Sequence, residues 1–182
     1  MSERPPPRIR VRVLAEPIDE REMIEYVRDA RAGAISVFVG TTREDFNGRR
    51  VIRLSYECYE DMAVETLRAI ATEMCAKYAG DGDESNARRE DGRGGRGVVA
   101  FDIAHRTGDV AAGETSVVVA CAASHRKDAC DAVAEAMEEL KARVPIWKKE
   151  ILEAPDGEEG AWKANATGTL FARARADADG SR

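Results

Sequence analysis

The segment 124–150 carries the residues whose types and spacing best suggest chemistry. It begins with Ser124, His125 and Arg126, where an apolar, β-branched run ends and a helical pattern starts. Backbone N–H groups, an imidazole and a guanidinium converge at such a junction, which is a favourable place for an anion. A solvated helix cap is the alternative interpretation of the same three residues.

Two lysines lie further along this segment. At about 100° per residue, Lys141 falls on the apolar stripe of the expected helix. A lysine on a buried face is costly unless it is paired or used, so we expect Lys141 to be partly desolvated, which makes its neutral amine more accessible. A buried stem with a solvated ammonium is the structural alternative. Lys148 follows after a proline, in an extended segment.

The periodicity of the chain indicates which elements position these residues. Three- and four-residue steps predict an amphipathic helix that Pro145 ends, with the apolar stripe Cys130, Val133, Met137, Leu140 and Val144. Further helices are expected over 18–31 and 61–78. Strands are expected near 9–13, 34–39, 52–56, 98–104, 115–123 and 146–152. The turn pair Asn47-Gly48 predicts a hairpin that joins 34–39 to 52–56.

These elements predict an α+β fold. Hairpins, a central strand pair and three main helices indicate a mostly antiparallel sheet in a single compact domain over 9–165. We expect 1–8 to be a disordered N-terminus and 166–182 a disordered tail, because both lack apolar periodicity. The glycine-rich, charged segment 79–97 has almost nothing to bury, so we expect a mobile insertion loop.

The composition narrows the class of protein. The chain has 182 residues and a formal net charge of −6, which argues against a nucleic-acid partner. A cationic site on an acidic chain favours a small anionic ligand. The four cysteines form no CxxC pair and have no zinc-like spacing, so we expect buried free thiols and no metal site. Without a signal peptide or membrane-spanning run, a cytoplasmic protein with no membrane association is expected.

Several ordered motifs resemble those of one known family. The Ser-His-Arg junction and the pattern LKxRxPxWKKE at 140–150 are similar to motifs of the large, catalytic subunit of molybdopterin synthase. So are Gly-Thr-Thr-Arg at 40–43 and His-Arg-Thr-Gly at 105–108, followed by Gly-Glu at 113–114. The resemblance covers roughly 9–162, apart from the insertion.

The resemblance implies a sulfurtransferase of molybdenum cofactor biosynthesis. Such an enzyme transfers two sulfurs to cyclic pyranopterin monophosphate and forms the molybdopterin dithiolene. The sulfur arrives on a partner, a small ubiquitin-like sulfur-carrier subunit with a C-terminal Gly-Gly thiocarboxylate. Two large subunits pair as a homodimer within a heterotetramer, and no further cofactor is implied.

The same resemblance assigns roles to residues of this sequence. Lys141 and Lys148 are the expected catalytic residues, as an amine for proton transfer or nucleophilic capture and as a stabiliser of oxyanions. Lys149 is the weaker candidate, because strand alternation points it away from Lys148. His105 and Arg106 match the family too, with a turn role equally open. The expected substrate-binding set is Arg43, His125, Arg126, Lys141, Lys148 and Lys149, whose cations suit phosphate and thiocarboxylate.

Two other functions remain open from the sequence. A non-catalytic adaptor that docks a ubiquitin-like tail would keep the groove but would need no buried lysine. An acyl or phosphoryl transferase acting on another phosphorylated substrate is the third possibility. The sequence has neither a P-loop nor an Asp pair for Mg²⁺ to support it. Incubation with the pterin precursor and a thiocarboxylated partner would separate the three functions.

Overall fold

A computed structural model describes residues 5–80, 97–154, 157–160 and 162–164. The segments predicted to be disordered or mobile, 1–8, 79–97 and 166–182, lie mostly outside these ranges. The elements are β1 (Arg8–Leu14), α1 (Glu20–Val27), β2 (Ala34–Thr41), β3 (Asp45–Phe46), β4 (Arg49–Cys58), α2 (Glu60–Lys77), β5 (Val98–Arg106), β6 (Gly108–Ala111), β7 (Thr115–Ala123), α3 (Arg126–Arg143), β8 (Ile146–Ala154), β9 (Gly157–Glu159) and β10 (Trp162–Ala164). This α+β architecture confirms the predicted fold class.

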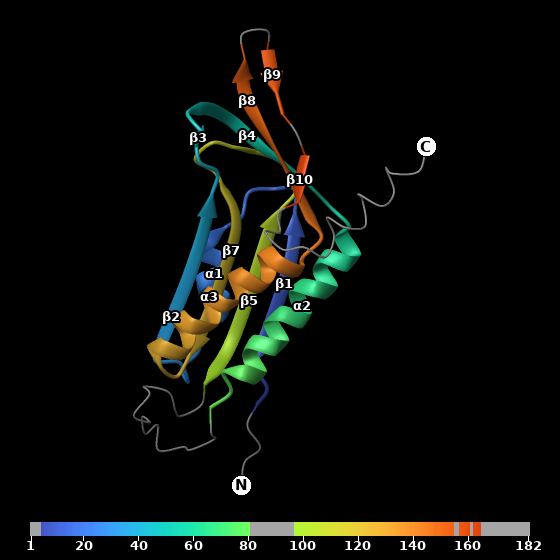
Figure 1. Cartoon of the computed structure of the whole chain (residues 1–182). Helices are drawn as coiled ribbons and strands as arrows, with labels where there is room; N and C mark the ends of the chain where they lie inside the picture. The colour runs from blue at the N-terminus through green and yellow to red at the C-terminus, as the bar shows by residue number, and fades with distance from the viewer. Residues whose placement is uncertain (1–4, 81–96, 155–156, 161, 165–182) are drawn as a thin grey trace.

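Two sheets form the body of the domain (Figure 1). The first has the strand order β1-β5-β7-β2, with β1 parallel to β5 and the other pairs antiparallel. The second has the order β10-β8-β4-β3, and β6 and β9 add to β4 and β8. Mostly antiparallel pairing confirms the prediction for the strands.

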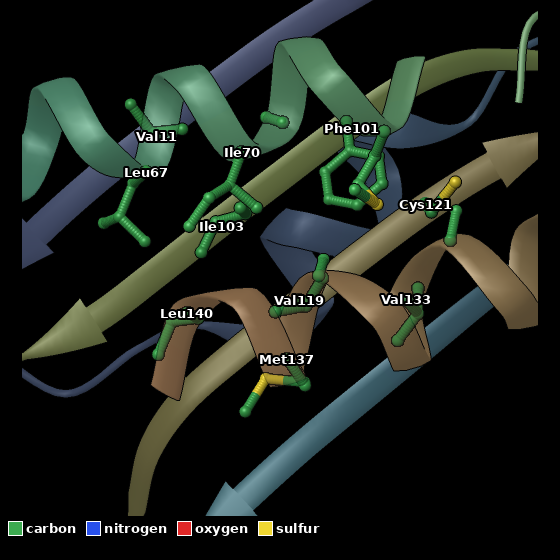
Figure 2. Close-up of a cluster of buried hydrophobic side chains, with 14 of the residues drawn as sticks. Val11, Leu67, Ile70, Phe101, Ile103, Val119, Cys121, Val133, Met137 and Leu140 are labelled. Carbon is green, nitrogen blue, oxygen red and sulfur yellow. The ribbon is translucent and has the colours of Figure 1, made fainter. Parts of the chain in front are cut away.

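The first sheet is covered on both faces. Strand alternation sends Val119 and Cys121 toward α2 and α3, where Phe101, Leu67 and Leu140 complete the main core (Figure 2). The intervening Val118, Ala120 and Ala122 face a smaller cluster with Met23 and Val27 of α1. Burial on both sides explains why β5 and β7 are continuous apolar runs rather than alternating ones.

The edge strand β1 shows the opposite pattern, as its alternating sequence predicts. Val11 is buried against the α2 side of the sheet. Arg10 and Arg12 point to the other face, where they pair with the buried Asp102 at 2.7 and 3.2 Å. Glu22 of α1 joins both arginines. A carboxylate buried in the sheet is therefore neutralised by two guanidinium groups.

The predicted hairpin between 34–39 and 52–56 is wrong. Asn47 and Gly48 do form a turn, with φ of 53° and 75°, but it joins β4 to the short strand β3. Strand β2 pairs with β7 in the first sheet, whereas β4 pairs with β8 and β6 in the second. Strand β2 is the edge strand of the first sheet, where Ile35 and Val37 are partly buried and Phe38 and Val39 stay exposed.

The helices agree with the predicted positions, with one change of length. α1 begins after Asp19, whose carboxylate accepts from the Glu22 N–H at 3.0 Å, and it ends at Val27, four residues before the predicted end. α3 ends at Arg143, because Val144 before the proline is extended. No helix of the described ranges is both long and apolar enough to cross a membrane.

The prediction that all four cysteines are buried is only partly correct. Cys75 and Cys121 are buried, Cys58 is half-buried and Cys130 is exposed. Burial raises the pKa of Cys75 to about 12. Cys130 therefore does not belong to the buried stripe of α3, which consists of Ala129, Ala132, Val133, Ala136, Met137 and Leu140, with Asp128 at its start.

Candidate functional site

A pocket of about 140 Å³ lies where the two sheets meet. Its walls come from the end of β2, the C-terminal part of β4, the end of β5, the start of β7 and the last turns of α3. The lining residues are Phe38, Gly40, Thr41, Tyr56, His105, Ser116, Val117, Met137, Leu140 and Lys141. The pocket thus combines an apolar wall, a wall of neutral polar groups and one cation.

A glycine and a bulge shape the wall that β2 and β7 provide. A Cβ on Gly40 would lie 2.7 Å from Val117 Cγ1 and 3.0 Å from the Phe38 ring, so only glycine fits here without displacement. The pairing register shifts between Gly40 and Thr41, which leaves Ser116 as the extra residue on β7. Such a bulge re-aims a side chain, and bulges are frequent next to active sites.

The bulged Ser116 is one of three buried residues with hydroxyl groups at the pocket. Its Oγ lies 3.1 Å from Thr42 Oγ1, and Tyr56 lines the pocket beside it. Burial raises the pKa of Tyr56, so the phenol keeps its proton at neutral pH and can donate a hydrogen bond.

His105 is a neutral member of the pocket wall. Its Nδ1 lies 2.7 Å from the Arg106 carbonyl oxygen, so Nδ1 carries the proton and Nε2 keeps a lone pair. The ring packs edge-on against Tyr56, with the ring centroids 5.0 Å apart. Complete burial lowers the pKa of His105 to about 4, which leaves the imidazole uncharged at neutral pH.

Arg106 takes the turn role that the sequence left open for this pair. Its guanidinium contacts Glu114 at 2.7 Å and donates to the Asp109 carbonyl at 3.2 Å. It thereby ties together the turns on both sides of β6, and it holds the pKa of Glu114 below its usual range. The motif His-Arg therefore divides between the pocket and the adjoining turn.

The predicted burial of Lys141 is wrong. Its side chain lines the pocket but is 46% exposed, and its Nζ lies 4.0 Å from Glu138 Oε1. Met137 and Leu140 occupy the buried face of the last turns of α3, and Lys141 comes next around the helix, at the edge of that face. The structure therefore has the alternative geometry, with the stem against the pocket and the ammonium in solvent.

Lys148 and Lys149 point to opposite faces of β8, as predicted. Lys148 pairs with Tyr56 of β4, and directly opposed residues share one face, so Lys148 lies on the Tyr56 side of the sheet. Its Nζ is 3.7 Å from the buried Glu150. Lys149 pairs with Ser55 and faces away. The structure does not bring Lys149 to the pocket.

Arg43 projects from the same end of the first sheet as the pocket. It is exposed and directly follows the buried Thr42. The Thr42 N–H donates to the Glu114 carbonyl at 2.9 Å, and its own carbonyl accepts from Gly113 at 2.8 Å. The backbone that carries Arg43 is therefore fixed to the turn before β7.

His125 and Arg126 do not join this group of cations. They stand at the start of α3, whereas Lys141 lies in its last turn. The His125 ring is buried, and its Nε2 has no hydrogen-bond partner among the described residues; Arg126 is exposed. The predicted cationic set thus falls into two groups at opposite ends of one helix. The described residues contain no cluster of His, Cys, Asp or Glu suited to a metal ion.

Comparison with known proteins identifies the family. The family model described as MoaE protein matches residues 13–143. The chain belongs to the MoaE protein family. A molybdopterin synthase catalytic subunit from Oryza sativa subsp. japonica is 44% identical over 148 residues, which are 81% of this chain and 65% of that protein. One from Drosophila willistoni is 38% identical over 155 residues, or 85% of this chain and 37% of that protein.

The fold agrees with this family membership. The crystal structure of molybdopterin synthase from Staphylococcus aureus matches with a TM-score of 0.69 and 32% identity, covering 83% of this chain and 94% of that one. The chain spans about a third to two thirds of the length of the two curated MoaE relatives named above.

The sequence of this MoaE family member does not single out the buried hydroxyl residues at the pocket, Thr42, Ser116 and Tyr56. Tyr56 occupies the last apolar position of an alternating strand, a pattern that gives it no chemical role. Ser116 was included in an apolar run, although it is the polar residue nearest the start of that run. A hydroxyl at the entrance of an otherwise apolar strand was the available signal.

Proposed function

We propose that this chain acts in the cytoplasm as the catalytic subunit of a molybdopterin synthase, a sulfurtransferase of molybdenum cofactor biosynthesis. Its substrate would be cyclic pyranopterin monophosphate, and its sulfur donor the thiocarboxylated C-terminus of a small ubiquitin-like subunit. Two sulfur transfers form the dithiolene, and each leaves a spent carboxyl end on the small subunit. Family membership supports this function, together with the convergence of Lys141, Lys148 and Arg43 at one end of the domain.

The shape of the pocket suits the end of the donor tail. Phe38, Gly40 and Val117 form a narrow apolar wall, which fits an extended Gly-Gly segment without side chains better than a three-ring pterin. The thiocarboxylate is an anion, and Lys141 at the edge of the pocket can attract it. Tyr56 and Ser116 offer neutral hydrogen bonds to the peptide groups of the tail. The pterin would then lie over the pocket, near Lys148 and Arg43.

The two lysines have different surroundings, which suggests different roles. Lys141 is exposed in the free chain, so its ammonium would lose water only when the tail enters the pocket. That step would make its amine available for proton transfer or for capture of the acyl group. The Nζ of Lys148 lies 3.7 Å from the Glu150 carboxylate, and this cation would suit a role in stabilising oxyanions.

His125 and Arg126 can contribute to the phosphate site only through a second copy of the chain. Along α3 they lie about 24 Å from Lys141, at 1.5 Å per residue over sixteen residues. Within one chain that distance is too great for a shared ligand of pterin size. We therefore propose a homodimer in which the α3 start of one protomer faces the Lys141 pocket of its partner, with one small subunit bound at each pocket.

A single-turnover assay with the thiocarboxylated small subunit and the phosphorylated pterin tests this function. We expect Lys141→Ala to reduce dithiolene formation by about 10²–10⁴-fold, the usual contribution of proton transfer. Lys141→Arg should fail almost as badly, because a guanidinium does not readily deprotonate. Lys127→Ala is the matched control, since Lys127 lies on the same helix and is also 46% exposed. All three variants should melt like the wild type.

A non-catalytic adaptor for a ubiquitin-like tail is the second candidate. The exposure of Lys141 favours it, because a buried lysine was the main argument against it. An adaptor would bind the small subunit in the same assay but form no dithiolene with any variant. Near-normal turnover by Lys141→Arg would instead leave Lys141 an electrostatic role only.

A further inference from the structure

We propose that His105 binds the donor tail, and that its Nε2 accepts a hydrogen bond from the N–H of the tail's terminal glycine. This role rests on the proposed sulfur transfer, because the tail is the segment that would bring the sulfur. The bond would set how far the tail enters the pocket and which way its last peptide group faces.

The imidazole of His105 has one tautomer in this fold. Its Nδ1 lies 2.7 Å from the carbonyl oxygen of Arg106. A carbonyl oxygen only accepts, so Nδ1 carries the proton and the neutral ring has a lone pair on Nε2. Complete burial lowers the pKa of His105 to about 4, which keeps the ring neutral at pH 7. Nε2 can therefore accept a hydrogen bond but cannot donate one.

This lone pair is accessible from the pocket. His105 lines the pocket and is 1% exposed. Among the described residues, the bond from Nδ1 is the one hydrogen bond of the ring. Nε2 of His105 is nevertheless not one of the buried side-chain atoms that lack a partner, whereas Nε2 of His125 is. The small exposure of the His105 ring therefore includes Nε2, and the space that this ring lines is the pocket.

The other side chains of the pocket offer different bonds. Four of them are apolar: Phe38, Val117, Met137 and Leu140. Lys141 can only donate, and the hydroxyl groups of Thr41, Tyr56 and Ser116 can donate as well as accept. Among the lining side chains, His105 is thus the one that accepts without donating.

A peptide N–H that enters the pocket needs such an acceptor. It loses its hydrogen bond to water, and without a partner its burial would weaken binding of the tail. The N–H nearest the thiocarboxylate has to enter together with it. The thiocarboxylate is an anion, which the lone pair of Nε2 repels and the ammonium of Lys141 attracts. One acceptor and one cation would therefore fix the direction of the tail.

Two contacts hold the imidazole in place before a tail arrives. Nδ1 donates to the main chain at the end of β5, and Tyr56 packs edge-on with the ring centroids 5.0 Å apart. A ring that is already ordered loses little freedom when it accepts a bond. A purely structural His105 would use the same two contacts and leave Nε2 without a role, so the experiment has to address Nε2.

An ester in place of one peptide bond tests the hydrogen bond from the side of the tail. A small ubiquitin-like subunit that ends in Gly-Gly with an ordinary carboxylate can be prepared by semisynthesis, with the terminal N–H replaced by an ester oxygen. Calorimetric titration would compare it with the unaltered subunit. We expect the wild-type chain to bind the ester form about 10-fold more weakly, because the ester oxygen donates nothing to Nε2. An ester placed earlier in the tail, outside the pocket, is the control and should bind like the unaltered subunit.

His105→Asn completes the comparison. Its amide can keep the donor to the Arg106 carbonyl, but it has no atom in the place of Nε2. This variant should bind the peptide and ester forms with affinities within about 2-fold of each other, because two changes to one bond are not additive. Tyr78→Phe is the control variant: it also removes a buried hydrogen bond, to Glu135 at 2.7 Å, but Tyr78 does not line the pocket. It should distinguish the two forms as the wild type does.

Nitrogen NMR of the imidazole provides a readout that needs no variant. In the free wild-type chain, Nδ1 should carry the proton and Nε2 should be unprotonated. The Nε2 resonance should shift when the unaltered subunit binds and should shift less with the ester form. This measurement still decides the role of His105 if His105→Asn does not fold.

Each outcome separates the role of His105 from the proposed function. Equal binding of the two forms by the wild type would overturn the role of His105 and leave the proposed function standing. So would an undiminished difference in His105→Asn, or a proton on Nε2 in the free chain. If the wild type bound neither form, the proposed function would fail, and the role of His105 would fail with it.

Discussion

His125 and Lys141 lie at opposite ends of α3, about 24 Å apart along the helix. Both residues belong to the segment 124–150, and the sequence therefore predicts a single cationic site that contains them. The helix keeps the two residues apart, because the chain rises by about 1.5 Å along the helix axis at each of the sixteen steps between them. Within one chain the two groups of cations are therefore separate, and the proposed homodimer would combine them.

Mixing two defective variants tests this arrangement. Lys141→Ala removes one group of cations and Arg126→Ala weakens the other. In a randomly mixed population half of the dimers contain both variants, and one of their two sites is intact, so about a quarter of wild-type activity should return at low pterin concentration. Differently tagged chains would verify that mixed dimers form. Mixed dimers without recovery would show that each site is built within one chain.

Pterin affinity should depend on both groups of cations. We expect Arg43→Ala and Arg126→Ala each to weaken binding of the phosphorylated pterin by roughly 1–3 kcal/mol, the contribution of a charged hydrogen bond. Calorimetric titration measures this directly. Arg50→Ala is a suitable control, since Arg50 is 69% exposed and, among the residues that the structure describes, its ion pair is the long one with Glu153 at 3.7 Å. Unchanged affinity for both variants would remove these arginines from the substrate site.

The buried His105 should make stability depend on pH. Its folded pKa is about 4 against an ordinary value of 6.5, so the unfolded state binds the extra proton between these values. The free energy of unfolding should therefore fall as the pH drops from 6.5 to 4, by roughly 3 kcal/mol in total. Above pH 6.5 the contribution of His105 to the free energy of unfolding is fully present.

Urea denaturation at several pH values would measure this effect in the wild type and in His105→Asn, whose amide can replace the Nδ1 donor. In the His105→Asn variant, the free energy of unfolding should lose the part of its pH dependence that His105 causes. Because carboxylates also titrate in the window, the difference between the two curves is the relevant quantity. His125→Gln changes the other of the two histidines and serves as comparison. Parallel curves for wild type and His105→Asn would contradict the assignment.

The insertion should be dispensable. Its two ends are held together by the bridge between Ala79 and Gly97 and by the Val98 N–H, which donates to the Tyr78 carbonyl at 3.0 Å. A short Gly linker in place of 81–96 can therefore close the gap with little change in loop entropy. We expect melting temperature and turnover to stay near wild type. A large loss of turnover with an unchanged melting temperature would assign the insertion to the site.

The sequence alone determined much of the local structure. Alternation predicted β1, with Arg10 and Arg12 on the face opposite Val11, and three- and four-residue steps predicted the buried Val133, Met137 and Leu140 of α3. Pro145 marked the end of that helix. These features depend on periodicity and on backbone restrictions, which act over a few residues and are visible in the order of amino acids.

Only the tertiary structure decided which of these elements meet. It paired β2 with β7 instead of β4, in a register of strand pairs between residues about 75 to 90 positions apart in the sequence. It left Lys141 at the edge of the buried face, which a helical wheel could not resolve. It also brought Thr42, Ser116 and Tyr56 together from three distant parts of the chain. Such contacts arise from packing between sheets, and no spacing along the sequence encodes them.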